Sequence, residues 1–215
     1  MRERPMLFSG PMVSALLDGR KTVTRRLVKP HHLGGTLDVV DVLNAGNAER
    51  AQVHCPYGAP GDRLWVKETW ALEDCGPDGE RVVWRADRAA AWRTNLADVY
   101  YLASNYEPSR WRPSIHMTRW ASRLTLEVVS IRAERLHDIT EADAQAEGVE
   151  RHPTENGWRN YEPEPAFEAV TYHATARESF ASLWRSINGP QSWDDNPWVW
   201  RVEFRRARGL NGGTL

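Results

Sequence analysis

The chain has 215 residues, a formal net charge of -1 and two cysteines. This length predicts one large domain, or one domain with insertions, because a domain usually holds about 100–200 residues. The near-neutral charge excludes a general nucleic-acid coat protein, so any nucleic-acid contact must come from a local basic patch. Cys55 and Cys75 are too few for a disulfide framework and indicate a reducing compartment. No apolar leader follows Met1 and no run approaches the ~18 apolar residues of a membrane span, so we expect a cytoplasmic protein without membrane contacts.

The pattern of apolar residues predicts short strands and a few helices. Alternating apolar and polar residues indicate strands, and apolar residues three and four apart indicate helices. A capping box at Thr140 and Asp143 starts one helix, which we expect to end near Gly148. The longest amphipathic stretch has four apolar side chains on one side: Phe180, Leu183, Trp184 and Ile187. The predicted helices are 11–18, 140–148 and 174–187, and the predicted strands are 6–9, 22–28, 63–70, 81–86, 119–132 and 198–204.

Tryptophan is over-represented, with 11 in the chain. It brings a large buried area and a stacking face, so a β-rich core or a base-stacking pocket would each account for this number. The strands and outer helices predict an α+β fold, namely a small, mostly antiparallel β-barrel with helices packed outside it. We expect a single domain over residues 1–208, with insertions at about 30–60, 72–115 and 150–173 and a flexible tail at 209–215. Residues 30–60 and 150–172 are predicted to be loops because they are rich in Pro and Gly.

The most distinctive stretch is Leu17-Asp18-Gly19-Arg20-Lys21-Thr22-Val23-Thr24-Arg25-Arg26. Gly19 ends an apolar helix, as glycine often does, and two pairs of cations then flank a β-branched triplet. A lysine, a hydroxyl and several guanidinium groups at a helix-to-strand corner suit either a nucleophile site or an anion cradle. The simpler alternative is a helix C-terminus with cations placed favourably against the helix dipole.

This stretch, together with three other segments in the same order, resembles the ASCH domains, which share the PUA-like β-barrel. Within them the chain is most similar to the N4-acetylcytidine amidohydrolase type. The Gly19-Arg20-Lys21-Thr22-Val23-Thr24 segment is the specific part of the match. The other matching segments are Gly61–Val66, Leu126–Gly148 and Val199–Phe204. The whole chain, including Trp111–Met117, is similar to longer ASCH-like proteins of phage and prophage genomes.

The resemblance implies a catalytic lysine, threonine and glutamate at Lys21, Thr24 and Glu147. Thr24 would attack the acyl carbonyl once a base takes its proton, and Lys21 can be that base if its pKa is lowered by burial and nearby cations. Glu147 would pass the proton to the leaving cytosine amine. Without the family, Glu147 would more simply be part of a solvated acidic helix end. The residues expected to contact the substrate are Arg20, Arg26, Trp65, Glu68 and His116.

Regular strand geometry sets a condition on this site. Side chains alternate between the two faces of a strand, so Lys21 and Thr24 would face opposite sides of a straight one. They share a face only where the chain is helical, turned or bulged. We therefore predict a break in regular strand geometry between Arg20 and Arg25. A straight strand through Thr24 would count against the three-residue site.

Other catalytic and metal-binding patterns are missing from the sequence. The histidines and cysteines show no metal-ligand spacing, and the zinc-deaminase pattern, the Gly-x-Ser-x-Gly elbow and the P-loop are absent. We expect neither a metal nor a cofactor. The arginine-rich stretch from Arg88 to Arg112 suits a nucleic-acid edge, but Asp87, Asp98 and Glu107 make a mixed solvated surface an equal alternative.

Three function classes remain open at this point. The first is an amidohydrolase acting on an N4-acylated cytosine nucleoside, or on an acylated base within a larger nucleic acid. The second is a PUA-like RNA- or DNA-binding module, with or without ribonuclease activity. The third is a phage protein whose insertions bind a protein partner. The complete set of Lys21, Thr24 and Glu147 favours the first, because a mere binder has no need of all three. A monomer is the default expectation.

Overall fold

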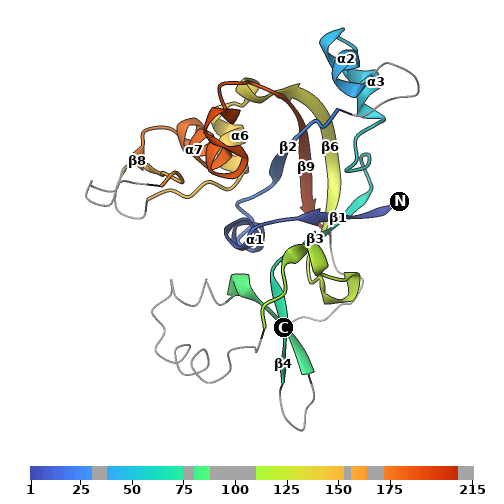
Figure 1. The fold of residues 1–215 in the computed structure, drawn as a ribbon, viewed down its shortest axis with the longest axis vertical. Helices are drawn as coiled ribbons and strands as arrows, with labels where there is room; N and C mark the ends of the chain where they lie inside the picture. The colour runs from blue at the N-terminus through green and yellow to red at the C-terminus, as the bar shows by residue number, and fades with distance from the viewer. Residues whose placement is uncertain (31–37, 75–79, 88–109, 153–155, 164–171, 208–215) are drawn as a thin grey trace. The chain divides into compact units, whose positions relative to one another are not determined.

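The computed structural model describes residues 1–30, 38–74, 80–87, 110–152, 156–163 and 172–207 (Figure 1). These residues form an α+β structure with five α-helices and mostly antiparallel strand pairs, so the predicted class is confirmed. The chain divides into two compact units. The first is built from residues 1–18, 61–127 and 205–215, and the second from 19–60 and 128–204. The predicted tail and much of the predicted insertions at 72–115 and 150–173 lie outside the described residues.

The first unit combines a parallel strand pair, a hairpin and one helix. Strand β1 (Glu3–Leu7) pairs in parallel with β3 (Arg63–Lys67), which pairs antiparallel with the first residues of β6 (Thr125–Arg135). Strands β4 (Trp70–Asp74) and β5 (Glu80–Trp84) form an antiparallel hairpin. Trp70, Met117 and Ala121 form a buried cluster beside this hairpin. The helical pieces described in this unit include α1 (Gly10–Leu17), the 3-10 turns η2 (Ser114–His116) and η3 (Arg119–Ala121), and residues 85–87.

The second unit holds three strands side by side, of which β6 and β9 are long, and four helices (Figure 1). Strand β9 (Trp198–Arg206) lies between β6 and β2 (Val23–Leu27), and β2 and β9 are antiparallel. The helices are α2 (Val39–Asn44), α3 (Ala48–Gln52), α6 (Glu141–Ala146) and α7 (Ala176–Asn188). The short elements are β7 (Trp158–Arg159), β8 (Tyr172–His173), η4 (Leu136–Asp138) and η5 (Pro190–Ser192). None of the helices in the described part of the chain is long and apolar enough to cross a membrane.

Helices α6 and α7 share one core with β9, and this core holds the C-terminus of α6 in place. Phe180 and Trp184 of α7 are buried with Ala144 of α6 and Val199 of β9. Both helices begin with a capping box: the predicted one at Thr140, and a second at Thr175. The predicted amphipathic face of α7 is correct for Phe180 and Trp184. It is wrong for Ile187, which is 54% exposed near the end of the helix.

Replacing Thr175 with alanine is expected to lower the free energy of unfolding by about 1 kcal/mol. The Thr175 hydroxyl accepts a hydrogen bond from the N–H of Glu178 at 3.2 Å, and this donor has no partner in the preceding turn of the helix. Urea unfolding measures the change. Ser186→Ala in the same helix is the control, because Ser186 is exposed and alanine favours helix. A Thr175→Ala variant as stable as Ser186→Ala would contradict the assigned cap.

Several of the predicted elements differ in the structure. The strand predicted over 6–9 ends at Leu7, and the strand predicted over 81–86 ends at Trp84, before the helical residues 85–87. The loop predicted over 150–172 contains β7. Residues 30–60 are not all loop, because Asp38 forms a capping box that starts α2, and Val39, Val42 and Leu43 of that helix are buried. The strand predicted over 63–70 ends at Lys67. The backbone N–H of Glu68 contacts Met117 Sδ at 3.3 Å, and the chain then enters a separate hairpin. The strand predicted from Arg119 begins at Thr125, after η3. Strand pairings among the described residues do not close a barrel, so the barrel stays a prediction.

Candidate active site

The segment between α1 and β2 is held against the C-terminus of α6. The chain turns at Asp18 and Gly19, where Gly19 has a φ of +73°, and it stays irregular until Val23. Three consecutive residues of this segment then donate hydrogen bonds to carbonyl groups at the end of α6, and the two segments run in opposite directions. Arg20 donates to the carbonyl of Gly148 at 3.1 Å, Lys21 to that of Glu147 at 2.8 Å, and the Thr22 N–H to that of Ala146 at 2.9 Å. These bonds satisfy carbonyl groups that a helix leaves unpaired at its C-terminus, where cations are also favourable.

Lys21 and Glu147 form a buried ion pair. The Nζ of Lys21 lies 2.7 Å from Oε2 of Glu147, and the two side chains are 0% and 3% exposed. Burial lowers the pKa of Lys21, the charge of Glu147 opposes this, and the nearby charges of Arg26 and Arg25 lower it further. Glu147 is therefore not part of a solvated helix end. A lysine whose pKa is lowered and which touches a carboxylate has the means to accept a proton and pass it on.

Arg25 extends this pair into a buried network of charges. Its guanidinium lies 3.3 Å from Oε1 of Glu147, 2.7 Å from Oε1 of Glu134 and 3.3 Å from Oδ2 of Asp143. Arg201, its cross-strand partner in β9, lies 2.9 Å from Oδ1 of Asp143. Burial raises the pKa of Asp143, but hydrogen bonds from Arg201 and from its capping partner outweigh this and leave that pKa lowered. Removing one buried partner of such a network leaves the others uncompensated.

Thr24 lies in a regular part of β2. Its strand pairs residue for residue with β9 from Val23 to Leu27, so the break predicted between Arg20 and Arg25 ends at Thr22. Because Arg25 reaches Glu147, alternation directs Thr24 toward the opposite face of the strand. Thr24 is 2% exposed, and among the described residues no hydrogen bond joins it to Lys21. This straight strand counts against a preformed three-residue site. Lys21 comes before the paired residues of β2, so the alternation of side chains does not fix the direction of its side chain.

The other residues expected at the site fall into two groups. Arg20 is exposed beside Gly148, and Arg26 lies half-buried in β2, on the same face as Thr24 by alternation. Trp65, Glu68 and His116 belong to the first unit.

Those three residues have separate surroundings within the first unit. The ammonium group of Lys67 lies 5.4 Å from the centre of the Trp65 ring. Glu68 is buried against Arg123, whose Nε lies 2.9 Å from its Oε1. Burial raises the pKa of Glu68, and Arg123 opposes the rise. His116 is exposed and lines a cavity, which is described below.

Sequence reasoning missed the carboxylates around Arg25. Glu134 is 7% exposed and Arg201 is 8% exposed. Asp143 is partly buried. The signal present in the sequence was a charged residue within an apolar strand, at Arg25 and again at Arg201. Only the register between β2 and β9 makes the two arginines neighbours, and only the fold brings α6 over them.

No metal site accompanies this network in the part of the chain that the structure describes, since no three His, Cys, Asp or Glu side chains gather suitably there. Comparison of the chain with protein-family models, with curated proteins and with solved structures finds no match. The geometry of the second unit is therefore the basis for a functional assignment.

Proposed function

We propose that the chain is an amidohydrolase that removes the acyl group from an N4-acylated cytosine nucleoside, in the manner of the ASCH domains and on a PUA-like barrel. The observation that carries the proposal is the buried contact between Lys21 and Glu147, with the pKa of the lysine lowered. A buried lysine with a lowered pKa is a recurring form of general base. The Gly-Arg-Lys-Thr-x-Thr segment supports the same assignment from the sequence.

Each of the three residues has a defined role in the proposed reaction. The neutral amine of Lys21 takes the proton of the Thr24 hydroxyl as its oxygen attacks the acyl carbonyl. Glu147, in contact with Lys21, relays a proton to the cytosine amine as the carbon–nitrogen bond breaks. Water then attacks the acyl ester, the carboxylic acid leaves, and Thr24 regains its proton. Positioned proton transfer of this kind typically contributes ~100–10,000-fold in rate.

The strand geometry defines how Lys21 must reach Thr24. Lys21 precedes the first paired residue of β2, so its side chain can approach from the end of the strand rather than from one face. The charges of both Arg25 and Arg26 act on Lys21, although these two side chains alternate to opposite faces. Lys21 is therefore close enough to Arg25 and to Arg26 for the charge of each to lower its pKa. Arg26, on the face of Thr24, is the cation proposed to hold the substrate's ring or phosphate.

The competing explanation is purely structural. Lys21 also donates to the last carbonyl groups of α6, and a capping role needs no chemistry. The two explanations differ in what they predict for the protonation of Lys21, because a cap works best as a cation whereas a general base must be neutral.

We expect the rate of cytidine release from N4-acetylcytidine to rise with pH and to level off below the ordinary lysine pKa of about 10.4. The sign follows from the lowered pKa of Lys21. The neutral amine gains population as pH increases through that lowered value, and only the neutral amine accepts the Thr24 proton. The measurement is kcat/KM as a function of pH, with cytidine separated by chromatography.

A matched lysine provides the control for this profile. Lys29→Met removes an exposed lysine just after β2, and kcat/KM of this variant is expected to rise with pH as in the wild type. A rate that falls as pH rises would contradict the role of Lys21 as base. So would a rising limb that persists unchanged in Lys21→Met.

A further inference from the structure

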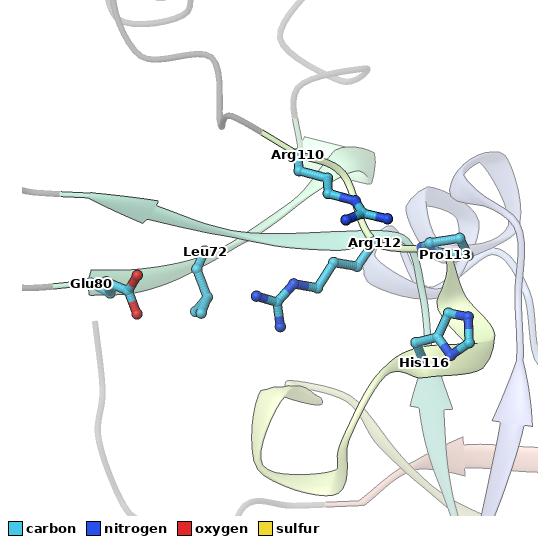
Figure 2. A pocket seen from close by; sticks show the side chains of 6 residues that line it. All are labelled: Leu72, Glu80, Arg110, Arg112, Pro113 and His116. Atoms are coloured by element: carbon cyan, nitrogen blue, oxygen red, sulfur yellow. The ribbon is translucent and has the colours of Figure 1, made fainter.

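A cavity of about 460 Å³ in the first unit is lined by basic side chains from one short stretch of chain (Figure 2). Arg110, Arg112 and His116 line it, with Leu72 and Glu80 of the hairpin across from them. Figure 2 shows Glu80 at the end of the cavity away from His116. Glu80 and His116 therefore lie at different ends of the same space, and the Arg112 side chain extends between them.

The basic end of the cavity is not neutralised within the described part of the chain. Other arginines of this unit face carboxylates: Arg123 contacts Glu68, and Arg119 contacts Glu3. The structure gives the guanidinium groups of Arg110 and Arg112 no such ion pair among the described residues. Since a guanidinium group carries five N–H donors suited to oxyanions, this part of the cavity has the chemistry that an anion requires.

Arg112 is also held in place before any ligand arrives. Its backbone exchanges hydrogen bonds with Trp70, at 3.2 and 2.8 Å, and its guanidinium lies over the Trp70 ring, 4.9 Å from the centre. Trp70 is 1% exposed and belongs to the buried cluster of this unit. Stacking on a buried ring fixes the guanidinium and leaves its edge donors available, which reduces the entropy lost on binding.

The size of the cavity indicates more than a bare ion. Pockets for small organic ligands usually measure about 300–1,000 Å³, and this one falls in that range. Leu72 and Pro113 add apolar surface to the wall of the cavity. The carboxylate of Glu80 can only accept hydrogen bonds when ionised, so it suits hydroxyl or amino groups at the far end of the ligand.

We propose that this cavity binds the phosphate of a nucleotide, with Arg110 and Arg112 on the phosphate, the ring or sugar along Leu72 and Pro113, and Glu80 accepting from a hydroxyl or amino group. Two guanidinium groups that line one cavity match the several oxygens and the charge of a phosphate. The nucleotide can be free or part of a nucleic-acid strand. None of the residues assigned to hydrolysis lines this cavity, and the proposal rests on none of them.

Calorimetric titration of the full chain with adenosine 5′-monophosphate tests the site. An adenine nucleotide is chosen so that binding cannot be attributed to a cytosine-directed active site. We expect the wild type to bind this nucleotide and to bind adenosine at least about tenfold more weakly. Arg110→Ala is expected to raise the dissociation constant of the nucleotide by about tenfold or more. Arg112→Lys keeps the charge but loses the planar fork, and it is expected to weaken binding as well.

Arg2→Ala is the matched control, because Arg2 is an exposed arginine of the same unit outside the cavity. It is expected to bind like the wild type. A short single-stranded oligonucleotide forms the second arm: tighter binding of the strand than of the mononucleotide, lost with Arg110→Ala, assigns the phosphate to nucleic acid. The proposal is overturned if neither ligand binds, if adenosine binds as well as its phosphate, or if Arg110→Ala behaves like Arg2→Ala.

Discussion

Replacing Glu147 with glutamine is expected to lower the free energy of unfolding by about 3–5 kcal/mol. Glu147 is the only carboxylate within 4.0 Å of Lys21 Nζ among the described residues, and Arg25 lies on its other oxygen. The amide removes the negative charge and leaves a buried ammonium group whose charge has no partner. Urea unfolding followed by circular dichroism measures the loss.

Glu150→Gln is the control for this variant. Glu150 pairs with Arg159 at 2.7 Å, but that arginine is 46% exposed, and pairs near solvent contribute about 0–1 kcal/mol. A double variant, Lys21→Met with Glu147→Leu, removes both charges and should recover much of the stability that Glu147→Gln loses. Equal losses from Glu147→Gln and Glu150→Gln would show that the Lys21–Glu147 pair is not buried as described.

Thr24→Ala is expected to reduce cytidine release from N4-acetylcytidine by roughly 100–10,000-fold, with little change in stability. The substitution removes the proposed nucleophile and leaves the strand pairing of β2 intact. Arg25 contacts Glu147, so strand alternation places Thr24 on the other face of β2. The variant therefore also tests whether Thr24 can act together with Glu147.

Thr22→Ala is the matched variant, two residues earlier in the same segment. Thr22 is exposed and joins α6 through its backbone N–H, which alanine keeps. It should retain the activity of the wild type. If Thr24→Ala also retains activity within about twofold, the nucleophile is water activated by Lys21 and Glu147, and the role of Thr24 is wrong.

The local signals of the sequence predicted α6, the helix whose C-terminus contacts Lys21. Thr140 with Asp143 formed the capping box expected of them, and α6 ends, as expected, just before Gly148, which has a φ of +86°. Such signals succeed because a cap involves residues only three apart, so no tertiary information is needed. The helix at Val39 was missed, although Asp38 and Asp41 form the same kind of box, because the surrounding Pro and Gly outweighed its four apolar residues.

The charge network was much harder to predict. Lys21 and Glu147 were both named from the family resemblance, and the structure places them in contact. Their contact spans 126 positions, and that between Arg25 and Glu134 spans 109. Contacts of this kind depend on strand register and helix packing, which a pattern of neighbouring residues does not encode. Strand alternation, in contrast, is a local rule: it predicts that Thr24 and Arg25 face opposite sides wherever β2 is regular.

The most direct test of the hydrolytic site is mass spectrometry of the wild type, quenched in acid while it turns over N4-acetylcytidine. The proposed mechanism predicts release of cytidine together with one acetyl group as an ester on Thr24. No release of cytidine by the folded protein would contradict the proposed function. Release of cytidine with the acetyl group on another residue would contradict the assignment of Thr24 as the nucleophile.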